Sequence, residues 1–195
     1  MQEQRADKIN EALKFYQKGV KEAQQGAYAR AIKHFSKVIA TIPQHVDARR
    51  NLAMAHLESG NVDQARELLR QGLKIDPTDA WTYVLLGNIA TKHERAFDVA
   101  EFYYEAGLNI NPNDNILFNN FATLQLEQGH FDKAKELFNK ALAIDPTYPN
   151  TYFGLALVNR MTGAPEAALK NLEQLFEQPA STDIRSAPVY KNVRE

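Results

Sequence analysis

Apolar residues in this chain recur at helical spacing, and glycine or proline interrupts them at regular intervals. The segment 115–129 is representative, because its apolar residues fall on one side of a helix and Gly129 follows at the end. A second apolar stripe covers 134–142 and ends at Ile144-Asp145-Pro146, where proline removes a backbone donor and disfavours helix before it. The pattern predicts a pair of packed helices, and no stretch has the period of two that is typical of a strand.

This pair of helices is repeated along the chain at intervals of 34 or 35 residues. Each second helix contains one alanine in phase with the others, here called the marker alanines: Ala31, Ala65, Ala100, Ala134 and Ala168. Small residues recur in the first helices at Gly19, Ala53, Gly87, Ala122 and Ala156. Large side chains follow the marker alanines by four residues, at Phe35, Leu69, Tyr104, Phe138 and Leu172. We expect the helices to approach most closely at the small residues, with the large side chains filling the space beside them.

Two places depart from the repeat. One interval has 35 residues because an extra residue lies within Thr91–Asp98, where the other repeats have a glycine. We expect a turn to hold this residue, since an insertion in a helix would shift its apolar face. The second departure is Arg49, which stands where the other four repeats have an aromatic residue.

The pattern resembles the tetratricopeptide repeat, a 34-residue helix–turn–helix unit. The motifs that carry the resemblance are Tyr83-x2-Leu86-Gly87 followed by Ala100-x3-Tyr104, and Ala134-x3-Phe138 with Pro146. The resemblance covers about residues 12–180, divided at about 12–45, 46–79, 80–114, 115–148 and 149–180. It implies an all-α fold, a right-handed α-solenoid of antiparallel helix–turn–helix units. Residues 1–11 are expected to lengthen the first helix, and residues 181–195 to form a tail or begin a capping helix.

Composition and charge narrow the classes of function. The chain of 195 residues has no cysteine, which excludes disulfides and thiolate sites, and no apolar run of the roughly 20 residues that a membrane helix needs. Its net charge is −1, but residues 1–75 carry 13 Lys and Arg against 8 Asp and Glu. No long run of one sign occurs, so we do not expect nucleic-acid binding. Because no apolar run is long enough to span a bilayer, we do not expect membrane insertion either. A cytoplasmic location is expected, or a periplasmic one if the chain is an excised or processed fragment.

No group of residues has the spacing of a catalytic or metal site. The five histidines include no pair at helical metal-ligand spacing, and the nine glycines lie at helix contacts and turns rather than in a phosphate-binding loop. We therefore expect no enzymatic activity, no metal and no cofactor in this chain.

The resemblance implies that the first helices line a concave groove that binds a peptide or helix of another protein. Residues that flank the aromatic and small positions are the candidate contacts: Tyr16, Arg50, Asn51, Trp81, Leu85, Asn88, Asn119, Asn120, Thr123 and Phe153. Asn51 and Asn120 hold equivalent places, where members of the family that bind peptide backbones carry asparagine. An amide suits this role because it donates and accepts at once.

The main hypothesis is a scaffold or adaptor that binds a partner protein in this groove without catalysis. A self-associating structural domain, and hence a homo-oligomer, is the first alternative, helped by the uneven charge. The second is the recognition arm of a larger enzyme or membrane-assembly protein. The carboxylate clamp by which some members of the family hold acidic chaperone tails is not expected, since only Asn51 fits its slots when the alignment starts from the first repeat.

Overall fold

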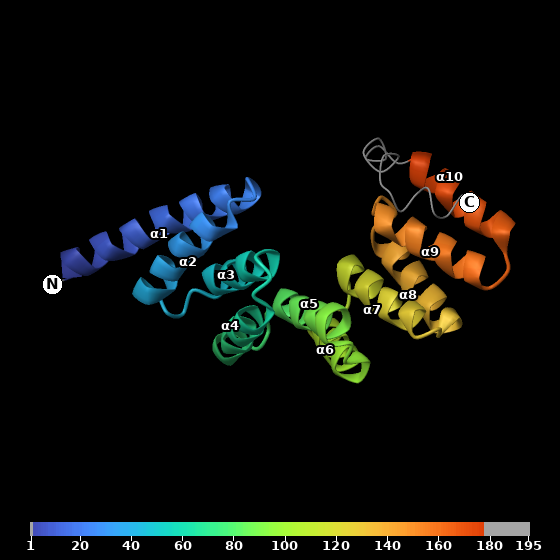
Figure 1. Cartoon of the computed structure of the whole chain (residues 1–195), viewed down its shortest axis with the longest axis horizontal. Helices are drawn as coiled ribbons and strands as arrows, with labels where there is room; N and C mark the ends of the chain where they lie inside the picture. Colours follow the sequence, from blue (N-terminus) through green and yellow to red (C-terminus); the bar gives the residue numbers. More distant parts are fainter. Residues whose placement is uncertain (1, 178–195) are drawn as a thin grey trace. The chain divides into compact units, whose positions relative to one another are not determined.

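The computed structural model describes residues 2–177, which form α-helices joined by short turns, with no strand in this range (Figure 1). The helices are α1 (Gln2–Gln24), α2 (Tyr28–Thr41), α3 (Val46–Glu58), α4 (Val62–Ile75), α5 (Ala80–Ile89), α6 (Phe97–Ile110), α7 (Asn115–Glu127), α8 (Phe131–Ile144), α9 (Pro149–Met161) and α10 (Pro165–Glu177). A π-helix, η1 (Ala90–Glu94), continues α5. The predicted all-α class is confirmed, and the predicted tail at 181–195 lies outside the described residues.

The chain divides into two compact units, Met1–Glu94 and Arg95–Glu195. In the first unit, α1 packs on α2, α3 packs on α4, and α5 follows against α4. In the second unit, α6 packs on α7, and α7 with α8 and α9 with α10 form helix pairs. The boundary falls inside the segment 80–114 that was predicted as the third repeat. Residues 2–11 belong to α1, which is therefore the longest helix described.

The marker alanines and the large side chains beside them form the core, as the sequence predicted. All five marker alanines are at most 5% exposed, and so are Phe35, Leu69, Tyr104, Phe138 and Leu172. Space at the contacts is tight: a Cβ added to Gly19 would lie 2.7 Å from Phe35 Cε1, and one added to Gly154 would lie 2.3 Å from Phe138 Cζ. Gly19, one of the recurring small residues, is therefore required by the Phe35 ring, and Gly154, which lies outside that set, is required by the Phe138 ring in the same way.

The extra residue of the third repeat lies in a helix rather than in a turn, so that expectation was wrong. It is absorbed by η1, in which i→i+5 hydrogen bonds put one more residue into a helical turn. The buried Thr91 hydroxyl donates to the carbonyl oxygen of Gly87 at 2.9 Å, within the widened region. The apolar face before the insertion is thereby kept in phase with the chain after it.

Arg95 takes the place of the turn glycine. Gly26, Gly60, Gly129 and Gly163 have φ between 72° and 78°, and within residues 2–177 Arg95 is the only non-glycine residue with positive φ, at 51°. This left-handed conformation costs a residue with a Cβ about 1–2 kcal/mol. The guanidinium of Arg95 lies 5.1 Å from the centroid of the Phe97 ring, a cation–π contact that offsets part of this cost.

Arg49 makes the same hydrogen bond as the tyrosines that hold its position in two other repeats. Tyr83 and Tyr152 each donate a hydroxyl hydrogen bond to the carbonyl of the proline six residues earlier, at 3.2 and 2.8 Å. Arg49 Nη2 donates in the same way to the carbonyl of Pro43 at 2.7 Å, and its Nη1 donates to Gln71 Oε1 at 2.8 Å. Arg49 therefore makes the hydrogen bond that tyrosine makes in two other repeats, whereas Phe15 and Phe118 fill this position without a donor.

Two glycine substitutions should change stability in opposite directions. Gly154→Ala forces its methyl group against the buried Phe138 ring and should lower the free energy of unfolding by about 1–3 kcal/mol. Gly72→Ala meets only Arg49 Cδ at 3.9 Å and should raise it by up to about 1 kcal/mol, because alanine favours helix. Urea unfolding of the full chain measures both. Equal effects of the two substitutions would contradict the packing described here.

A pair of substitutions tests the donor at residue 49. Arg49→Ala leaves the Pro43 carbonyl and Gln71 without their charged donor and should cost about 2 kcal/mol or more. Arg49→Tyr should recover most of that loss, because tyrosine reaches the equivalent proline carbonyl from α5 and α9. Thermal and urea unfolding give the comparison. If tyrosine is no better than alanine, the equivalence is wrong.

Candidate functional site

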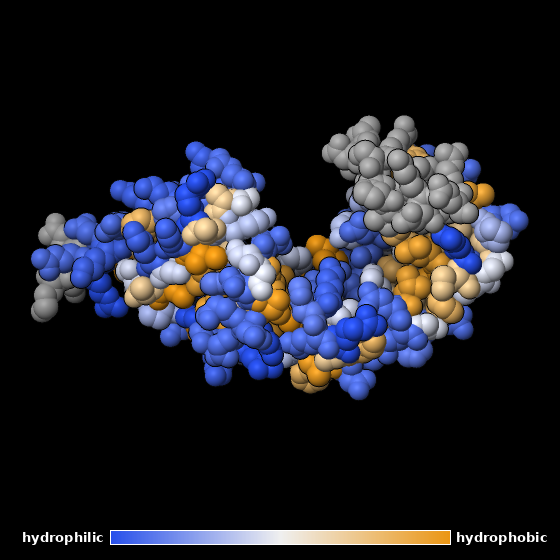
Figure 2. Space-filling model, in the orientation of Figure 1, coloured by the Kyte–Doolittle hydropathy of each residue, from blue (hydrophilic) through white to orange (hydrophobic). Residues whose placement is uncertain are grey.

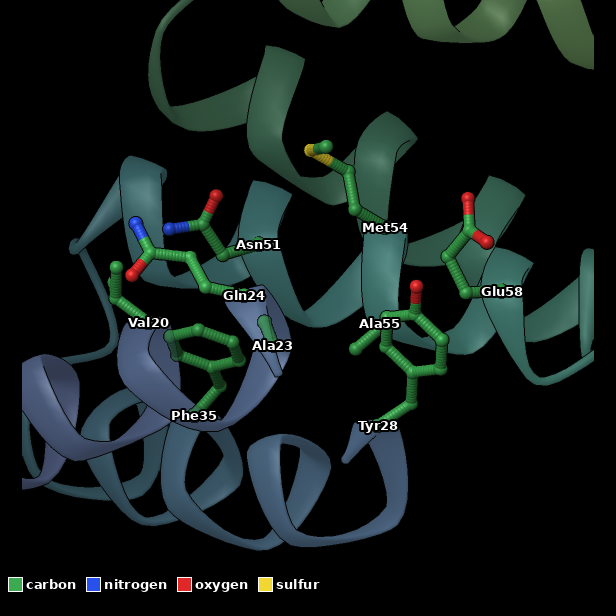
Figure 3. A pocket seen from close by; sticks show the side chains of 9 residues that line it. All are labelled: Val20, Ala23, Gln24, Tyr28, Phe35, Asn51, Met54, Ala55 and Glu58. Carbon is green, nitrogen blue, oxygen red and sulfur yellow. The ribbon is translucent and has the colours of Figure 1, made fainter. Parts of the chain in front are cut away.

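The first unit carries a pocket of about 360 Å³ between α1 and α3, floored by α2 (Figure 3). Its lining residues are Val20, Ala23, Gln24, Tyr28, Phe35, Asn51, Met54, Ala55 and Glu58. The pocket lies on the face of the first helices that was predicted to bind a partner, and it contains one of the predicted residues, Asn51. Most of the other lining residues are apolar.

The polar groups of the pocket lie at its two ends. Figure 3 shows the amides of Gln24 and Asn51 close together on one side and the Glu58 carboxylate with the Tyr28 hydroxyl on the other. Phe35 is fully buried beneath them, whereas Met54 is 37% exposed at the rim. An apolar side chain fits such a site, with hydrogen-bonding groups available to the backbone on either side of it.

Asn51 is held in position by Tyr16. Asn51 Nδ2 donates to the Tyr16 hydroxyl at 3.1 Å, and the Tyr16 ring packs against His45, with centroids 4.9 Å apart. Burial, with Asp47 as a further cause, raises the pKa of the Tyr16 hydroxyl above its ordinary value, so the group stays protonated at neutral pH. The two predicted residues are therefore joined by a hydrogen bond through the Asn51 amide nitrogen, and the Asn51 side-chain oxygen takes no part in it.

Arg50 joins α3 to the start of α5. Its Nη1 lies 2.6 Å from Asp79 Oδ2, and its Nη2 pairs with Asp47. Asp79 also accepts from the Thr82 hydroxyl at 2.6 Å. Since two carboxylates neutralise Arg50, it serves to fix these helices beside the pocket, and only 20% of its side chain is exposed.

The other predicted residues of the first unit differ in exposure. Trp81 and Asn88 are half-buried. Leu85 is only 7% exposed, and its neighbour Val84 is fully buried. The expectation of an exposed Leu85 is therefore wrong, because the apolar residues of α5 are used for packing on more than one side of that helix.

In the second unit, the side-chain amide of Asn119 is buried between helices. Asn119 is 5% exposed, and its Oδ1 accepts from the Thr151 hydroxyl of α9 at 3.4 Å. The Thr123 hydroxyl donates to the Asn119 backbone carbonyl at 2.9 Å. Asn119 is thus not a surface contact, contrary to prediction, whereas Asn120, Thr123 and Phe153 stay half-buried and reachable.

Sequence reasoning missed Tyr28 and Phe35 as members of the pocket. Both belong to α2, a second helix, whereas the prediction considered only first helices. The residue at the start of a second helix points back over the turn toward the next first helix, and a repeat alignment carries no sign of this. Gln24, Met54 and Glu58 belong to the first helices α1 and α3, but they were not among the candidate contacts.

Two kinds of feature are absent from the part of the chain that the structure describes: a cluster of metal-binding side chains and a membrane-spanning helix. Within residues 2–177 no three His, Cys, Asp or Glu side chains come together as a metal site would require. In the same range no helix is both long and apolar enough to cross a bilayer.

Sequence comparison identifies the repeats. The sequence model of the tetratricopeptide repeat matches residues 22–86 and 125–187, more than half of the chain. The chain belongs to the tetratricopeptide repeat family. Tetratricopeptide repeat domains generally act as protein–protein interaction modules.

Solved structures have the same fold at low sequence identity. PilW, a type IV pilus biogenesis factor, is 20% identical with a TM-score of 0.78, over 85% of this chain and 76% of that chain. The tetratricopeptide repeat protein TTC0263 of Thermus thermophilus is 23% identical with a TM-score of 0.74, over 94% and 97% of the two chains. MamA is 23% identical with a TM-score of 0.68, over 82% of this chain and 92% of that chain. These likenesses establish the fold alone.

Curated relatives contain the matched region as a small part. The human protein O-mannosyl-transferase TMTC3 is 27% identical over 143 residues, which cover 70% of this chain and 16% of that protein. The mitochondrial import receptor subunit TOM70 of Rattus norvegicus is 23% identical over 112 residues, which cover 57% of this chain and 18% of that protein. The chain therefore spans less than a fifth of the length of either relative.

A pH-dependent loss of stability should come from His56 of α3. Burial lowers the pKa of its imidazole in the folded state, so the unfolded chain binds a proton more readily. The stability that depends on neutral His56 is present above about pH 6.5 and is lost as pH falls below that value. His56→Gln removes this loss and should keep the fold, because Gln125 stands at the equivalent place of α7.

The measurement is urea unfolding of the full chain at pH 7.5 and 5.5. The native chain should lose more stability over this interval than the His56→Gln variant. His93→Gln, at an exposed position of η1, is the control and should behave like the native chain. A native chain and a His56→Gln variant with the same pH dependence would contradict the assignment.

Proposed function

We propose that this chain is a non-catalytic adaptor domain whose first-helix face binds an extended segment of a partner protein. The observation that carries the proposal is the pocket between α1 and α3, with its apolar floor and its amides at one end. An apolar side chain of the partner enters this pocket above Phe35. The general role of the family in protein binding and the geometry of the pocket support this proposal.

The hydrogen-bonding groups select an extended backbone. Asn51 is held by Tyr16, so its amide is ordered before the partner arrives and loses little conformational entropy on binding. Gln24 lies beside it and offers a second amide. A peptide unit needs one donor and one acceptor, which two adjacent amides provide.

The groove is tested with two variants and a matched control. Peptides are selected from a random display library on the native full chain and measured by fluorescence anisotropy. Asn51→Ala should weaken binding by about five- to tenfold, the loss of one hydrogen bond, and Met54→Glu, which puts a charge at the apolar rim, by at least as much. Asn120→Ala removes the equivalent asparagine of the second unit and should leave affinity unchanged.

The test has clear outcomes. Peptides with an apolar residue at a fixed position, held by the native chain and lost by Asn51→Ala and Met54→Glu, support the pocket. Peptides that bind all three variants alike would place recognition elsewhere on the molecule. Loss only in Asn120→Ala would move the site to the second unit.

Self-association is the second candidate, and one observation favours it. The described residues of the second unit carry 6 Lys and Arg against 11 Asp and Glu, whereas residues 1–75 carry an excess of cations. Unlike ends attract, which favours head-to-tail contact. Light scattering behind a sizing column should then report a larger particle at low salt than at high salt, and a monomer at both salts rejects this candidate.

Membership in a larger protein is a further proposal, supported by the lengths of the relatives. In those proteins the matched region accompanies other segments, as in the O-mannosyl-transferase TMTC3. The proposed adaptor would then deliver a partner protein to an activity located outside residues 1–195.

A further inference from the structure

The outer face of α6 carries an exposed apolar stripe. Phe102 is 63% exposed, Val99 is 43% exposed and Ile110 is 36% exposed, with half-buried Ala106 between them. These residues are spaced so that they lie along one side of a helix. Figure 2 shows hydrophobic surface at the place that Figure 1 gives to this helix.

The stripe is not needed for the packing of the repeat. The residues of α6 that enter the core are Ala100, Tyr104 and Gly107, on the other side of the helix. An exposed side chain such as Phe102 contributes little to folding, and clustered exposed apolar residues mark interaction sites. These residues therefore indicate a role in binding rather than a role in folding.

The sister helices of the same chain provide an internal comparison. Two residues after the marker alanine, where α6 has Phe102, the other second helices have Lys33, Glu67, Glu136 and Lys170. One residue before the marker alanine, where α6 has Val99, they have Arg30, Gln64, Lys133 and Ala167. Three of the other second helices thus have polar or charged side chains at both positions, α10 has Ala167 at one of them, and only α6 has large apolar side chains at both.

The charged side chains of α6 itself are all negative. The sequence of α6 contains Asp98, Glu101 and Glu105 and no Lys or Arg. Glu101 pairs with Lys133 of α8 at 2.5 Å, whereas Asp98 and Glu105 have no ion pair among the described residues. The stripe therefore lies within a negative field, which repels nucleic acid and anionic lipid surfaces.

The same field argues against a second copy of this face as the occupant. Pairing two α6 helices through a twofold axis would bring their carboxylates together with no cation of either helix to balance them. A partner with Lys or Arg beside its apolar residues balances them instead. From Val99 to Ile110 the stripe is about 16 Å long, which is three turns of a helix.

We propose that the outer face of α6 docks a basic amphipathic helix of a partner protein. The apolar side of that helix packs on Val99, Phe102 and Ile110, and its Lys or Arg side chains reach Asp98 and Glu105. This surface is separate from the pocket between α1 and α3, and it gives the adaptor a second point of attachment.

The probe for this surface is a synthetic helical peptide of about 14 residues, with leucine on one side and lysine along both edges. Fluorescence anisotropy measures its binding to the full chain. Phe102→Gln removes the aromatic ring without adding charge and should weaken binding at least tenfold, as expected for a central aromatic contact. The paired variant Asp98→Asn/Glu105→Gln should weaken it about threefold and flatten its salt dependence.

Three controls distinguish binding at this face from nonspecific attraction to acidic residues and from binding in the proposed groove. Met161→Gln removes a residue that is 62% exposed on α9, equally apolar and exposed but off the stripe, and should leave affinity unchanged. A peptide with glutamate in place of lysine should not bind. Asn51→Ala, which tests the groove, should not alter binding of the leucine–lysine peptide.

Each contrary result overturns the proposal. Equal affinity of native chain, Phe102→Gln and Met161→Gln means that the stripe is not the site. Equal binding of the glutamate peptide means that charge does not select the partner. A native oligomer that Phe102→Gln converts to a monomer, seen by light scattering, means that the occupant is a second copy. Unchanged melting of Phe102→Gln ensures that loss of binding is not loss of fold.

Discussion

The close approach of two helices at a small residue is the constraint on which this structure depends. A ring packs where the neighbouring helix has only hydrogen or methyl, as Phe35 does on Gly19 at the recurring small position. Phe138 packs on Gly154 in a similar way, although this glycine lies outside the recurring set. Because there is no space for a further carbon atom, the positions of small and large residues in each repeat are fixed relative to one another. The 34-residue period of the sequence is the consequence of this packing, and each helix pair becomes stable only when its exposed faces are covered by neighbours.

Where the sequence departs from its period, the structure keeps the packing and changes the backbone. The extra residue before Arg95 widens the end of α5 into a π-helix, so the helices on both sides retain their apolar faces. Arg95 then adopts the left-handed conformation that glycine has in the other turns. Arg49 shows the same principle in a side chain, since its guanidinium reaches the proline carbonyl that a tyrosine hydroxyl reaches in two other repeats. The requirement is a contact or a conformation, and more than one residue type can satisfy it.

The two proposed binding surfaces differ in how the fold provides them. The pocket between α1 and α3 arises because successive first helices leave a space that α2 floors, and Asn51 at one end of it is held by Tyr16. The stripe on α6 arises from the choice of residues alone, at positions that the fold leaves free. The first belongs to the scaffold of the family and takes its specificity from a few side chains. The second is specific to one helix of this chain, and its negative surroundings set the chemistry of what it can hold.

The sequence by itself determined the helical class, the repeat, its family and the residues of the core, because these follow from spacing that local physics imposes on every repeat. It also placed Asn51 and Tyr16 on the inner face, although their hydrogen bond and the pocket beside them required three helices to be in position. The tertiary structure alone decided that Leu85 and Asn119 are buried and that Asn119 is bonded to Thr151. Whether a residue on a helix faces solvent depends on what packs on both sides of that helix. The periodicity of the sequence identifies only one of the two packed sides. The π-helix at η1 was also decided by the tertiary structure alone. An inserted residue is equally compatible with a longer turn and a wider helix until the packing of both flanking segments is known.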